Sequence, residues 1–415
     1  MIKELERTIN NSLDKVIKLN GELIYDVDYT NYKNKTFPFN GLIDINKSNV
    51  IIDGSNSTIQ FNIKNLDSND CALFYIHAEA ENVEFRNLNI KVRIENDSHA
   101  NAYFMFIYNT GRNFKLLNSN IEISSDKQMN LVGIYNNGNL FTHMETRADN
   151  MLIDNNIINL YCLPDELKIA CFLYGIYNNL ANSITVTNNH IYTTTLGNGD
   201  AQRAIGVYTN GRYGRYIGNN IKANGSHPAG LELEQASAYG FINEGLFTII
   251  NANNIVAQWA GIAIGIENKG EEALITSNKV LSTHNIFGRC IRNYESRVLI
   301  DSNMLVSTSK NARMVEHNAS NAIISNNFME MLLPTHECIT GCGIYSDSPG
   351  IGCNTFIGNI MFNMKTCGLF VKPDSAIIAN NQLASSDYAT LEVLSYNQEI
   401  KNLLDESHIK TIVRE

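Results

Sequence analysis

Two glutamates, Glu232 and Glu234, are separated by a single leucine. If this run is a strand, both side chains project from the same face, about 7 Å apart. That separation suits an acid and a base, or an acid and a nucleophile, on the two sides of a glycosidic bond. Their repulsion would raise the pKa of one carboxyl group, as a general acid requires. We therefore predict that this pair is catalytic; the alternative is a solvated acidic patch.

Arg292, Glu316 and Glu267 are further charged residues in the same region of the chain. Arg292 could bind a substrate carboxylate or hydroxyl groups, or form an ion pair with Glu316. We add Arg292 and Glu316 to the catalytic candidates and Glu267 to the substrate-binding ones. A lyase or an epimerase would instead need a base and a group that stabilises a sugar carboxylate. The candidates for those roles are Arg203, Tyr208, Arg212, Tyr239 and Arg292.

Most of these residues belong to a recurring segment that reads glycine, apolar residue, X. If the segments are strands that stack in register, their X residues form one outward column with a spacing of about 4.8 Å. The expected column is Tyr108, Tyr135, Tyr177, Tyr208, Glu232, Ala263, Arg292, Glu316 and Tyr345. A second column, two residues further on, is Thr110, Asn137, Asn179, Asn210, Glu234, Gly265, Tyr294, Asn318 and Asp347.

Aromatic and polar side chains alternate along these columns in a way that suits a chain of sugar rings. Aromatic faces offer apolar platforms, and amides and charged groups offer fixed hydrogen-bond partners. The alternative is a tyrosine stack that only stabilises the fold. The predicted substrate-binding residues of the two columns are Tyr135, Tyr177, Tyr208, Tyr294 and Tyr345.

Four insertions lengthen the repeats that surround this region, and they could form the walls of a groove. They lie at 138–150, 161–173, 193–204 and 236–247. The residues expected to line the groove are Asp200, Arg203, Tyr239 and Trp259. His317 follows Glu316 directly, so we expect it to point inward as a core histidine.

A short asparagine-rich pattern repeats along the chain and predicts the elements that position these residues. An apolar residue, any residue, a small or amide residue and then asparagine recur, as in Ile153–Asn156, Val186–Asn189 and Ile275–Asn278. The period is about 25 residues with insertions, which is typical of short strands joined by turns. Asparagine tolerates the left-handed turn conformation and can form hydrogen-bonded ladders between stacked strands.

The repeat predicts an all-β fold, a right-handed parallel β-helix of about 11–12 rungs. A leucine-rich repeat would show a different motif, and a propeller would need about 40 residues per repeat. Residues 2–18 have apolar positions at helical spacing and are expected to cap the open end of the solenoid. The expected organisation is an N-terminal cap and lead-in at 1–40, the β-helix at 41–395 and a C-terminal cap or tail at 396–415.

These features resemble the pectate-lyase-like superfamily of right-handed β-helices over roughly residues 40–395. The resemblance implies the fold and a carbohydrate-active protein, but not the reaction. The Asn-Thr-Asp and Gly-His-Gly set of polygalacturonases and the Asp-Pro-His motif of alginate epimerases are absent from the sequence. The expected function is cleavage or rearrangement of glycosidic bonds by carboxylates. The alternatives are a lyase or epimerase that uses Arg and Tyr, and a non-catalytic glycan-binding protein.

Composition limits the partners. Of 415 residues, 44% are apolar and 18% are charged, which indicates an ordered chain, and the net charge of −10 disfavours nucleic acid. Eight cysteines lack paired metal-binding spacing, so we expect core thiols, no metal and no cofactor. The sequence shows no signal peptide or membrane span, so we expect no membrane partner. The resemblance and the two outward columns imply that the partner is an oligo- or polysaccharide. The expected location is cytoplasmic, or a phage particle. The resemblance implies a homo-oligomer, either a trimer or a dimer.

Overall fold

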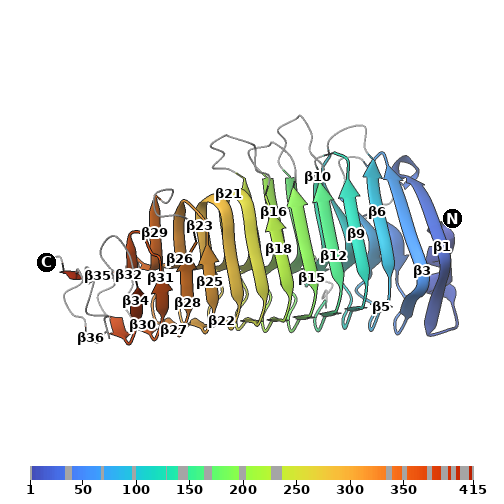
Figure 1. The fold of residues 1–415 in the computed structure, drawn as a ribbon. Helices are drawn as coiled ribbons and strands as arrows, with labels where there is room; N and C mark the ends of the chain where they lie inside the picture. Colours follow the sequence, from blue (N-terminus) through green and yellow to red (C-terminus); the bar gives the residue numbers. More distant parts are fainter. Residues whose placement is uncertain are drawn as a thin grey trace.

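The chain forms a right-handed parallel β-helix, shown in Figure 1. The computed structural model describes residues 2–32, 40–66, 70–95, 100–127, 129–138, 148–162, 171–195, 202–225, 236–332, 339–347, 353–371, 376–384, 391–393, 399–401 and 411–413. Every strand pairing recorded within these ranges is parallel and joins one turn of the solenoid to the next. The predicted fold class is therefore confirmed.

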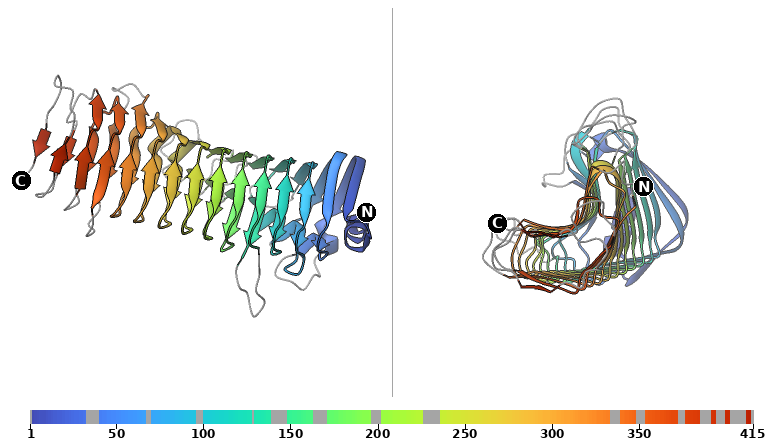
Figure 2. Two further views of the ribbon diagram at one scale, coloured as in Figure 1. Left: turned by 90° about the horizontal axis from the view of Figure 1, so that it is seen from below. Right: turned by 60° about the vertical axis from the view of Figure 1, so that its left-hand side comes forward.

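Each turn of the solenoid carries three strands, so the molecule has three faces that run along its length (Figure 2). The first face consists of β2 (Asn40–Ile45), β4 (Cys71–Ile76), β7 (Ala100–Asn109), β10 (Met129–Asn137), β13 (Cys171–Asn179), β16 (Gln202–Thr209), β19 (Ser237–Asn243), the later parts of β21 (Asn254–Asn268) and β23 (Lys279–Asn293), β26 (Asn311–His317), β29 (Thr340–Ser346), β32 (Cys367–Val371), β35 (Leu391–Val393) and β37 (Thr411–Val413).

The second face is made mainly of three- and four-residue strands. It consists of the start of β3 (Ile51–Lys64), β5 (Glu84–Arg86), β8 (Lys115–Leu117), β11 (Leu152–Asp154), β14 (Thr185–Thr187), β17 (Arg215–Ile217), β20 (Ile249–Asn251), β22 (Leu274–Thr276), β24 (Leu299–Asp301), β27 (Ile323–Ser325), β30 (Asn354–Ile357), β33 (Ala376–Ala379) and β36 (Glu399–Lys401).

The third face completes each turn. It consists of the end of β3, β6 (Asn89–Glu95), β9 (Asn120–Ser125), β12 (Ile157–Cys162), β15 (His190–Thr195), β18 (Asn220–Asn224), the starts of β21 and β23, β25 (Met304–Ser307), β28 (Phe328–Met331), β31 (Ile360–Phe362) and β34 (Gln382–Ala384). Inward side chains of all three faces form a continuous apolar core.

A buried asparagine ladder turns the chain from the second face to the third. Each member donates from its side-chain amide to the amide oxygen of the next, at N···O distances of 2.9–3.0 Å. The residue before each member has a positive φ of 52–70°. Six of these nine residues are asparagine or glycine, which adopt that conformation at low cost. The members are Asn156, Asn189, Asn219, Asn253, Asn278, Asn303, Asn327, Asn359 and Asn381. The predicted ladder is thus confirmed.

The first-face glycines serve the interior of the solenoid. A Cβ on Gly175 would lie 2.6 Å from the carbonyl oxygen of Gly206 and would also collide with Ile191 in the core. Gly206 meets the equivalent obstruction from Gly240 and Ile221. These glycines therefore leave room inside the solenoid and not over its outer face, because their missing side chains would point inward.

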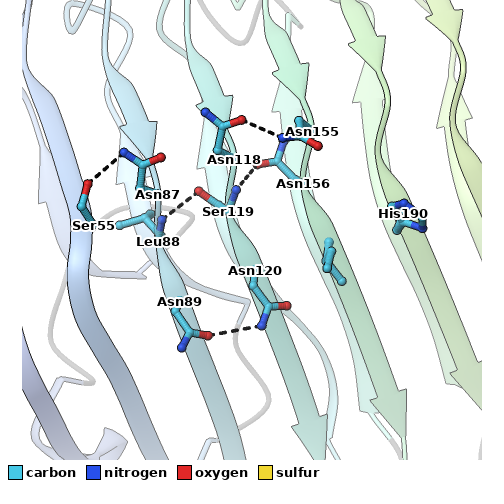
Figure 3. Close-up of a pocket in the computed structure, with 11 residues that line it drawn as sticks. Ser55, Asn87, Leu88, Asn89, Asn118, Ser119, Asn120, Asn155, Asn156 and His190 are labelled. Carbon is cyan, nitrogen blue, oxygen red and sulfur yellow. Dashed lines mark hydrogen bonds between the residues drawn. The ribbon is translucent and has the colours of Figure 1, made fainter.

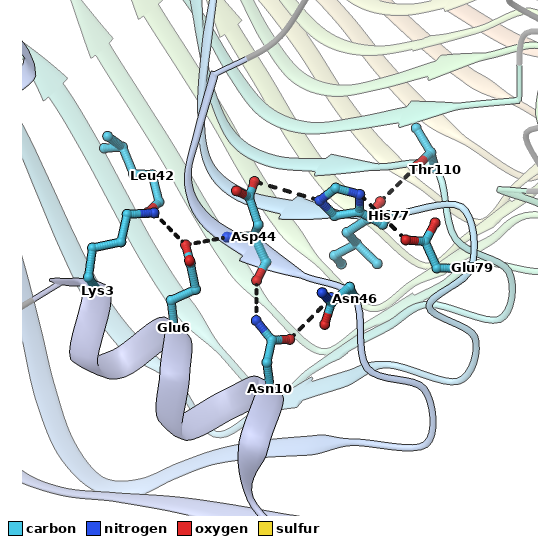
Figure 4. Close-up of polar contacts among 10 residues, drawn as sticks. Lys3, Glu6, Asn10, Leu42, Asp44, Asn46, His77, Glu79 and Thr110 are labelled. Carbon is cyan, nitrogen blue, oxygen red and sulfur yellow. Dashed lines mark hydrogen bonds and ion pairs between the residues drawn. The ribbon is translucent and has the colours of Figure 1, made fainter. Parts of the chain in front are cut away.

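The N-terminal helix α1 (Ile2–Asn11) covers the open edge of β2 with its side chains (Figure 4). Glu6 Oε2 accepts a hydrogen bond from Asp44 N at 3.0 Å, and Asn10 Nδ2 donates to Asp44 O at 2.7 Å. Asn10 Oδ1 accepts from Asn46 N at 3.2 Å. The helix ends earlier than the predicted residue 18, because β1 (Val16–Asp28) already pairs with β3 from Val16 onward. A short 3-10 helix, η1 (Tyr29–Tyr32), follows β1.

Candidate functional site

The first face carries an outward column that runs almost the full length of the solenoid. Strand register fixes its order as Tyr75, Tyr108, Tyr135, Tyr177, Tyr208, Ile242, Glu267, Arg292, Glu316, Tyr345 and Phe370. Most of the predicted column is therefore confirmed. Two places were assigned wrongly, because Ile242 and Glu267 occupy the positions that we gave to Glu232 and Ala263.

The wrong assignments have one physical cause. The segments ending at Glu232 and Ala263 match the pattern of glycine, apolar residue, X, but so do those ending at Ile242 and Glu267. Hydrogen bonding between rungs selects the later segment in both cases, and Ala263 instead pairs with Ala238. Glu232, Glu234 and Asp200 lie outside the described residues, so their predicted roles stay predictions.

The tyrosines of the column stack on one another along the solenoid. Ring centroids of Tyr135 and Tyr177 are 4.7 Å apart with an interplanar angle of 18°, and those of Tyr177 and Tyr208 are 4.6 Å apart at 17°. Tyr345 lies between Phe370 at 4.6 Å and the guanidinium carbon of Arg313 at 3.6 Å. Neighbouring side chains cover these ring faces at Tyr135, Tyr177 and Tyr345, and the predicted substrate-binding role of these tyrosines stays a prediction. The rings present edges and hydroxyl groups instead.

Beyond the tyrosines, the same face carries what we call the charged cluster. Its members are Glu244, Glu267, Lys269, Arg289, Arg292, Arg313 and Glu316. Four cations therefore accompany three carboxylates, which gives the cluster a net positive charge. A chain of net charge −10 thus has a local cationic region on its outer surface.

Glu316 has more cationic partners than either of the other two carboxylates of this cluster. Its side chain is 7% exposed and contacts three guanidinium groups: Arg289 Nε, Arg292 Nε at 3.6 Å and Arg313 Nη1 at 3.2 Å. Burial raises the pKa of Glu316, but Arg289, Arg292 and Arg313 together lower it by a larger amount. The net pKa therefore lies below the usual value. Glu316 is therefore an ionised anchor for the arginines and is unsuited to act as a general acid.

Glu267 and Glu244 continue the polar network towards the tyrosines. Lys269 Nζ lies 3.1 Å from Glu267 Oε2 and 3.2 Å from Glu244 Oε1. Tyr208 donates a hydrogen bond to Glu244 Oε2 at 2.6 Å. Burial and this hydrogen bond raise the pKa of Tyr208, so its hydroxyl stays protonated. The network thus connects the tyrosine stack directly to the charged cluster.

Tyr239 lies beside the charged cluster in a neighbouring outward column, between Ile205 and Ile264. Burial raises the pKa of its hydroxyl, and Glu267 raises it further, while Arg203 and Arg292 lower it. These interactions place the Tyr239 phenol in the electrostatic field of the cluster. Arg203 itself lies over the ring of Phe172 at 5.4 Å.

Two further residues predicted to bind substrate, Tyr294 and Trp259, lie in different parts of the structure. Tyr294 belongs to the charged region, with its ring centroid 4.8 Å from the guanidinium carbon of Arg292. Trp259 lies on β21, eight residues before Glu267 of the outward column. It is 39% exposed and has a positive φ of 55°.

His317 is fully buried, as predicted. Its Nδ1 lies 3.0 Å from Asn293 Nδ2 and its Nε2 lies 3.2 Å from Asn354 Oδ1.

Sequence reasoning missed Arg289, Arg313, Glu244 and Lys269. Arg289 and Arg313 precede Arg292 and Glu316 by three residues, a spacing that a regular strand would place on opposite faces. The strand pairing skips one residue in each rung, between Arg289 and Ile291 and between Arg313 and Val315, so residues three apart both point outward. Glu244 lies two residues after Ile242, and Lys269 lies two residues after Glu267. Assigning Ile242 and Glu267 to the outward column would therefore have identified both charged residues as well.

Within the described ranges no group of three or more His, Cys, Asp or Glu side chains is arranged to hold a metal ion. In the same part of the chain, no helix has the length and apolar character needed to cross a membrane. Of the seven cysteines in this part, six are buried and Cys353 is exposed.

No family model and no curated protein matches the sequence, but solved structures match the fold. The A-module of the Azotobacter vinelandii mannuronan C-5 epimerase AlgE6 has 9% identity and a TM-score of 0.50, with 98% of this chain and 95% of that chain covered. The Dettilon tailspike protein has 12% identity and a TM-score of 0.37, with 81% of this chain covered. A tailspike mutant of E. coli bacteriophage HK620, in complex with a pentasaccharide, has 9% identity and a TM-score of 0.43, with 97% and 74% covered.

These likenesses concern architecture. The alignment spans 62% of the length of the Dettilon tailspike. The epimerase module, which is covered almost completely, shares the parallel β-helix, so the resemblance in fold expected from the sequence is confirmed. At 9% identity the likeness establishes the fold and leaves the activity to be argued from the side chains.

Proposed function

We propose that this protein binds an acidic polysaccharide along its first face and acts on it by proton transfer next to the sugar carboxylate. The reaction class would be that of a polysaccharide lyase or a C-5 epimerase. The observation that carries the proposal is the surplus of guanidinium groups around Glu316 on an outward column. A uronate carboxylate is the complement of such a surplus, and Arg binds carboxylates in bidentate geometry.

Arg292 and Arg313 are the arginines available to a substrate. Their side chains are 32% and 30% exposed, whereas Arg289 is 14% exposed and donates to the carbonyl oxygens of Gly288 and Asn311. In the proposal, Arg289 keeps Glu316 in place while Arg292 and Arg313 neutralise the sugar carboxylate. Neutralisation makes the neighbouring C–H bond more acidic, which both lyases and epimerases require.

Tyr239 is the proposed proton donor. Its raised pKa keeps the phenol protonated at neutral pH. In elimination, a base removes the proton next to the carboxylate and Tyr239 gives a proton to the departing glycosidic oxygen. In epimerisation, it would return a proton to the carbon from the other side. Arg203 and Arg292 contribute to the field at this phenol and would stabilise negative charge that develops there.

Hydrolysis by two carboxylates is the competing proposal, and it depends on Glu232 and Glu234. Glu316 does not favour it, because a hydrolase needs one protonated carboxyl group. Glu316 is held ionised by arginines, and Glu267 lies within 4 Å of both Lys269 and Arg292. Non-catalytic binding is a further candidate, since these same ion pairs also suit a rigid recognition surface.

The test measures activity on polymers of mannuronate, guluronate, galacturonate and glucuronate. Ultraviolet absorbance detects the unsaturated product of a lyase, proton NMR detects epimerisation, and reducing ends detect hydrolysis. We expect Tyr239→Phe to lower kcat by roughly 10²–10⁴ with little change in binding, as loss of a general acid does. The matched control is Tyr161→Phe, which removes a hydroxyl on the third face, away from the charged cluster.

Other outcomes would redirect the assignment. Reducing ends that appear without absorbance, and that disappear in Glu232→Gln or Glu234→Gln, would establish hydrolysis and refute the Tyr239 proposal. Tight binding of an acidic polymer without any product would establish the recognition role. Activity that is unchanged in both Tyr239→Phe and Arg292→Ala would remove the charged cluster from the mechanism.

A further inference from the structure

A groove lies away from the first face, at the corner where the second face turns into the third (Figure 3). It has a volume of about 690 Å³. The residues that line it are Ser55, Asn87, Leu88, Asn89, Asn118, Ser119, Asn120, Asn155, Asn156, Ile157 and His190. None of these side chains is Asp, Glu, Lys or Arg, in contrast to the charged cluster.

The turn geometry of three successive rungs creates this groove. Asn87, Asn118 and Asn155 have positive φ values of 53°, 49° and 55°, and they form one wall. The next residue of each rung is buried and forms the floor, as Ser119 does at 3% exposure. The residue after that begins the third face and forms the opposite wall, as Asn120 does.

Towards the middle of the molecule, the first wall of the groove loses its amide side chains. The residues in the positions that follow Asn155 and Asn188 along this wall are Gly218 and Ala252. Amide groups face each other across the corner at the rungs of Asn87 and Asn118, and the second wall continues with Ile157 and His190. Three rung intervals at about 4.8 Å separate Asn87 from Asn188 and give this stretch of the first wall a length of roughly 14 Å.

The amide ladders of the two walls are interrupted inside the groove. Asn155 Nδ2 donates to Asn118 Oδ1 at 2.9 Å, yet Asn118 Nδ2 donates to no group among the described residues. On the other wall, Asn120 Nδ2 donates to Asn89 Oδ1 at 3.2 Å, and Ile157 follows Asn120 where an amide would continue the row. A donor on Asn118 and an acceptor on Asn120 thus remain available to a ligand.

We propose that this groove binds a neutral, linear glycan. Unpaired amide donors and acceptors match sugar hydroxyl groups, and an uncharged lining gives no advantage to an acidic sugar. Ile157 is 41% exposed and offers an apolar contact for the C–H face of a ring. The imidazole of His190 is exposed at the end of the groove and is held near Tyr192 Oη at 3.3 Å. The rung spacing is close to the length of one sugar unit in an extended chain.

The site is independent of the proposed function, because the groove shares no residue with the charged cluster. A protein with both sites would hold a neutral segment of a glycan at this corner and an acidic segment on the first face. Failure of either site would leave the other unaffected. The experiments therefore use different ligands and different variants.

Isothermal titration calorimetry with cello-, malto-, xylo- and mannohexaose tests the proposal on the full chain. We expect at least one hexasaccharide to bind and the double variant Asn118→Ala, Asn120→Ala to weaken binding by about tenfold or more, as loss of one or two hydrogen bonds does. Asn254→Ala is the matched control, since Asn254 continues the row of Asn120 outside the groove and donates to Asn220 Oδ1 at 2.9 Å. Arg292→Ala should leave neutral binding unchanged.

A second variant guards against an indirect effect of the alanines. Asn120→Trp would fill the groove while leaving the buried floor intact, and it should abolish binding. Thermal unfolding of each variant checks that the solenoid is retained. The proposal is overturned if no neutral hexasaccharide binds the wild-type chain, or if Asn120→Trp, folded as judged by its melting temperature, binds as the wild type does.

Discussion

Glu316 is a buried carboxylate whose charge is balanced by Arg289, Arg292 and Arg313. Such a group stabilises the folded state only while its partners are present, because removal of one member leaves the other charges desolvated. The sequence predicted Glu316 in the outward column and its pairing with Arg292 as one option. Its role as an anchor follows from the two further arginines, which became visible only through the strand register.

Replacement of Glu316 by Gln is therefore expected to destabilise the protein. The neutral amide no longer balances three guanidinium groups, and the free energy of unfolding should fall by about 3 kcal/mol. Urea unfolding followed by circular dichroism measures the loss. Glu330→Gln is the matched control, since Glu330 is half-buried on the third face, and its effect should stay within about 0.5 kcal/mol. Equal effects of the two substitutions would contradict the anchor role.

His317 makes stability depend on pH. Burial lowers its pKa to about 4 from the ordinary value of 6.5. The unfolded chain therefore binds a proton more readily, so the stabilisation is complete above about pH 6.5 and is lost as the pH falls towards 4. The expected loss is up to about 3 kcal/mol over this window, measured by urea unfolding at several pH values.

His317→Asn tests the origin of that pH dependence. Asparagine occupies the equivalent position one rung earlier, where Asn268 Nδ2 donates to Asn293 Oδ1 at 2.6 Å. The variant should therefore fold at neutral pH and lose less stability between pH 6.5 and 4 than the wild type. An unchanged pH profile would show that other groups cause the acid sensitivity.

At the scale of elements, the buried asparagine ladder fixes each turn from the second face to the third. Asn278 donates to Asn303 Oδ1 at 3.0 Å and to Ile250 O at 2.8 Å, and its oxygen accepts from Asn253. Because these groups are buried, their loss leaves unsatisfied donors and acceptors on both neighbouring rungs. The ladder thus couples adjacent turns of the solenoid in addition to the strand hydrogen bonds.

Asn278→Ala should lower the free energy of unfolding by about 2–4 kcal/mol, since several buried partners lose their hydrogen bonds. Differential scanning calorimetry or urea unfolding measures the change. Asn254→Ala, on the exposed row, is the control and should change stability by less than about 1 kcal/mol. A similar small change for both would mean that water replaces the ladder without loss.

The first-face glycines make a second prediction for the elements. A Cβ on Gly206 would come within 2.6 Å of Gly240 O, a backbone atom that cannot move without disturbing the next rung. Gly206→Ala should therefore destabilise the protein by about 1–3 kcal/mol in urea unfolding. Cys290 occupies the same place in a later rung, next to Ile291 and Arg292, and there the interior accommodates a side chain. Cys290→Ala should cost less than Gly206→Ala, and the reverse order would refute the steric explanation.

At the scale of the whole molecule, a solenoid has open ends that a globular sheet protein does not have. Helix α1 closes one of them by supplying side-chain partners to β2, as Lys3, Glu6 and Asn10 do (Figure 4). Its apolar side, with Ile2, Leu5 and Ile9, packs on the core. The helix thus occupies the place of a preceding strand and prevents another chain from pairing there.

The double substitution Glu6→Ala, Asn10→Ala is expected to expose the edge of β2. Unpaired backbone groups on that edge would favour end-to-end association, which light scattering detects as a mass that rises with concentration. Arg7→Ala is the control, because Arg7 is on the exposed side of the helix. If the double variant has the same mass as the control at all concentrations, the edge-protection role is wrong.

The sequence by itself determined the repeat, and the repeat determined the fold. Turn asparagines, inward apolar residues and glycines are local requirements that recur in every rung, so their spacing is visible without coordinates. The tyrosine positions followed from the same spacing, because Tyr135, Tyr177 and Tyr208 each come two residues after a conspicuous glycine. The inward position of His317 followed from simple alternation.

Tertiary structure decided which residues share a rung where insertions interrupt the repeat. Both Glu232 and Ile242 end a segment of the expected pattern, and only pairing with Tyr208 selects Ile242. Tertiary structure also decided that the ring faces of the tyrosines cover one another and that Arg289 and Arg313 point outward. Register and irregular strand pairing arise from hydrogen bonds between distant segments, and a local pattern carries no information about that choice.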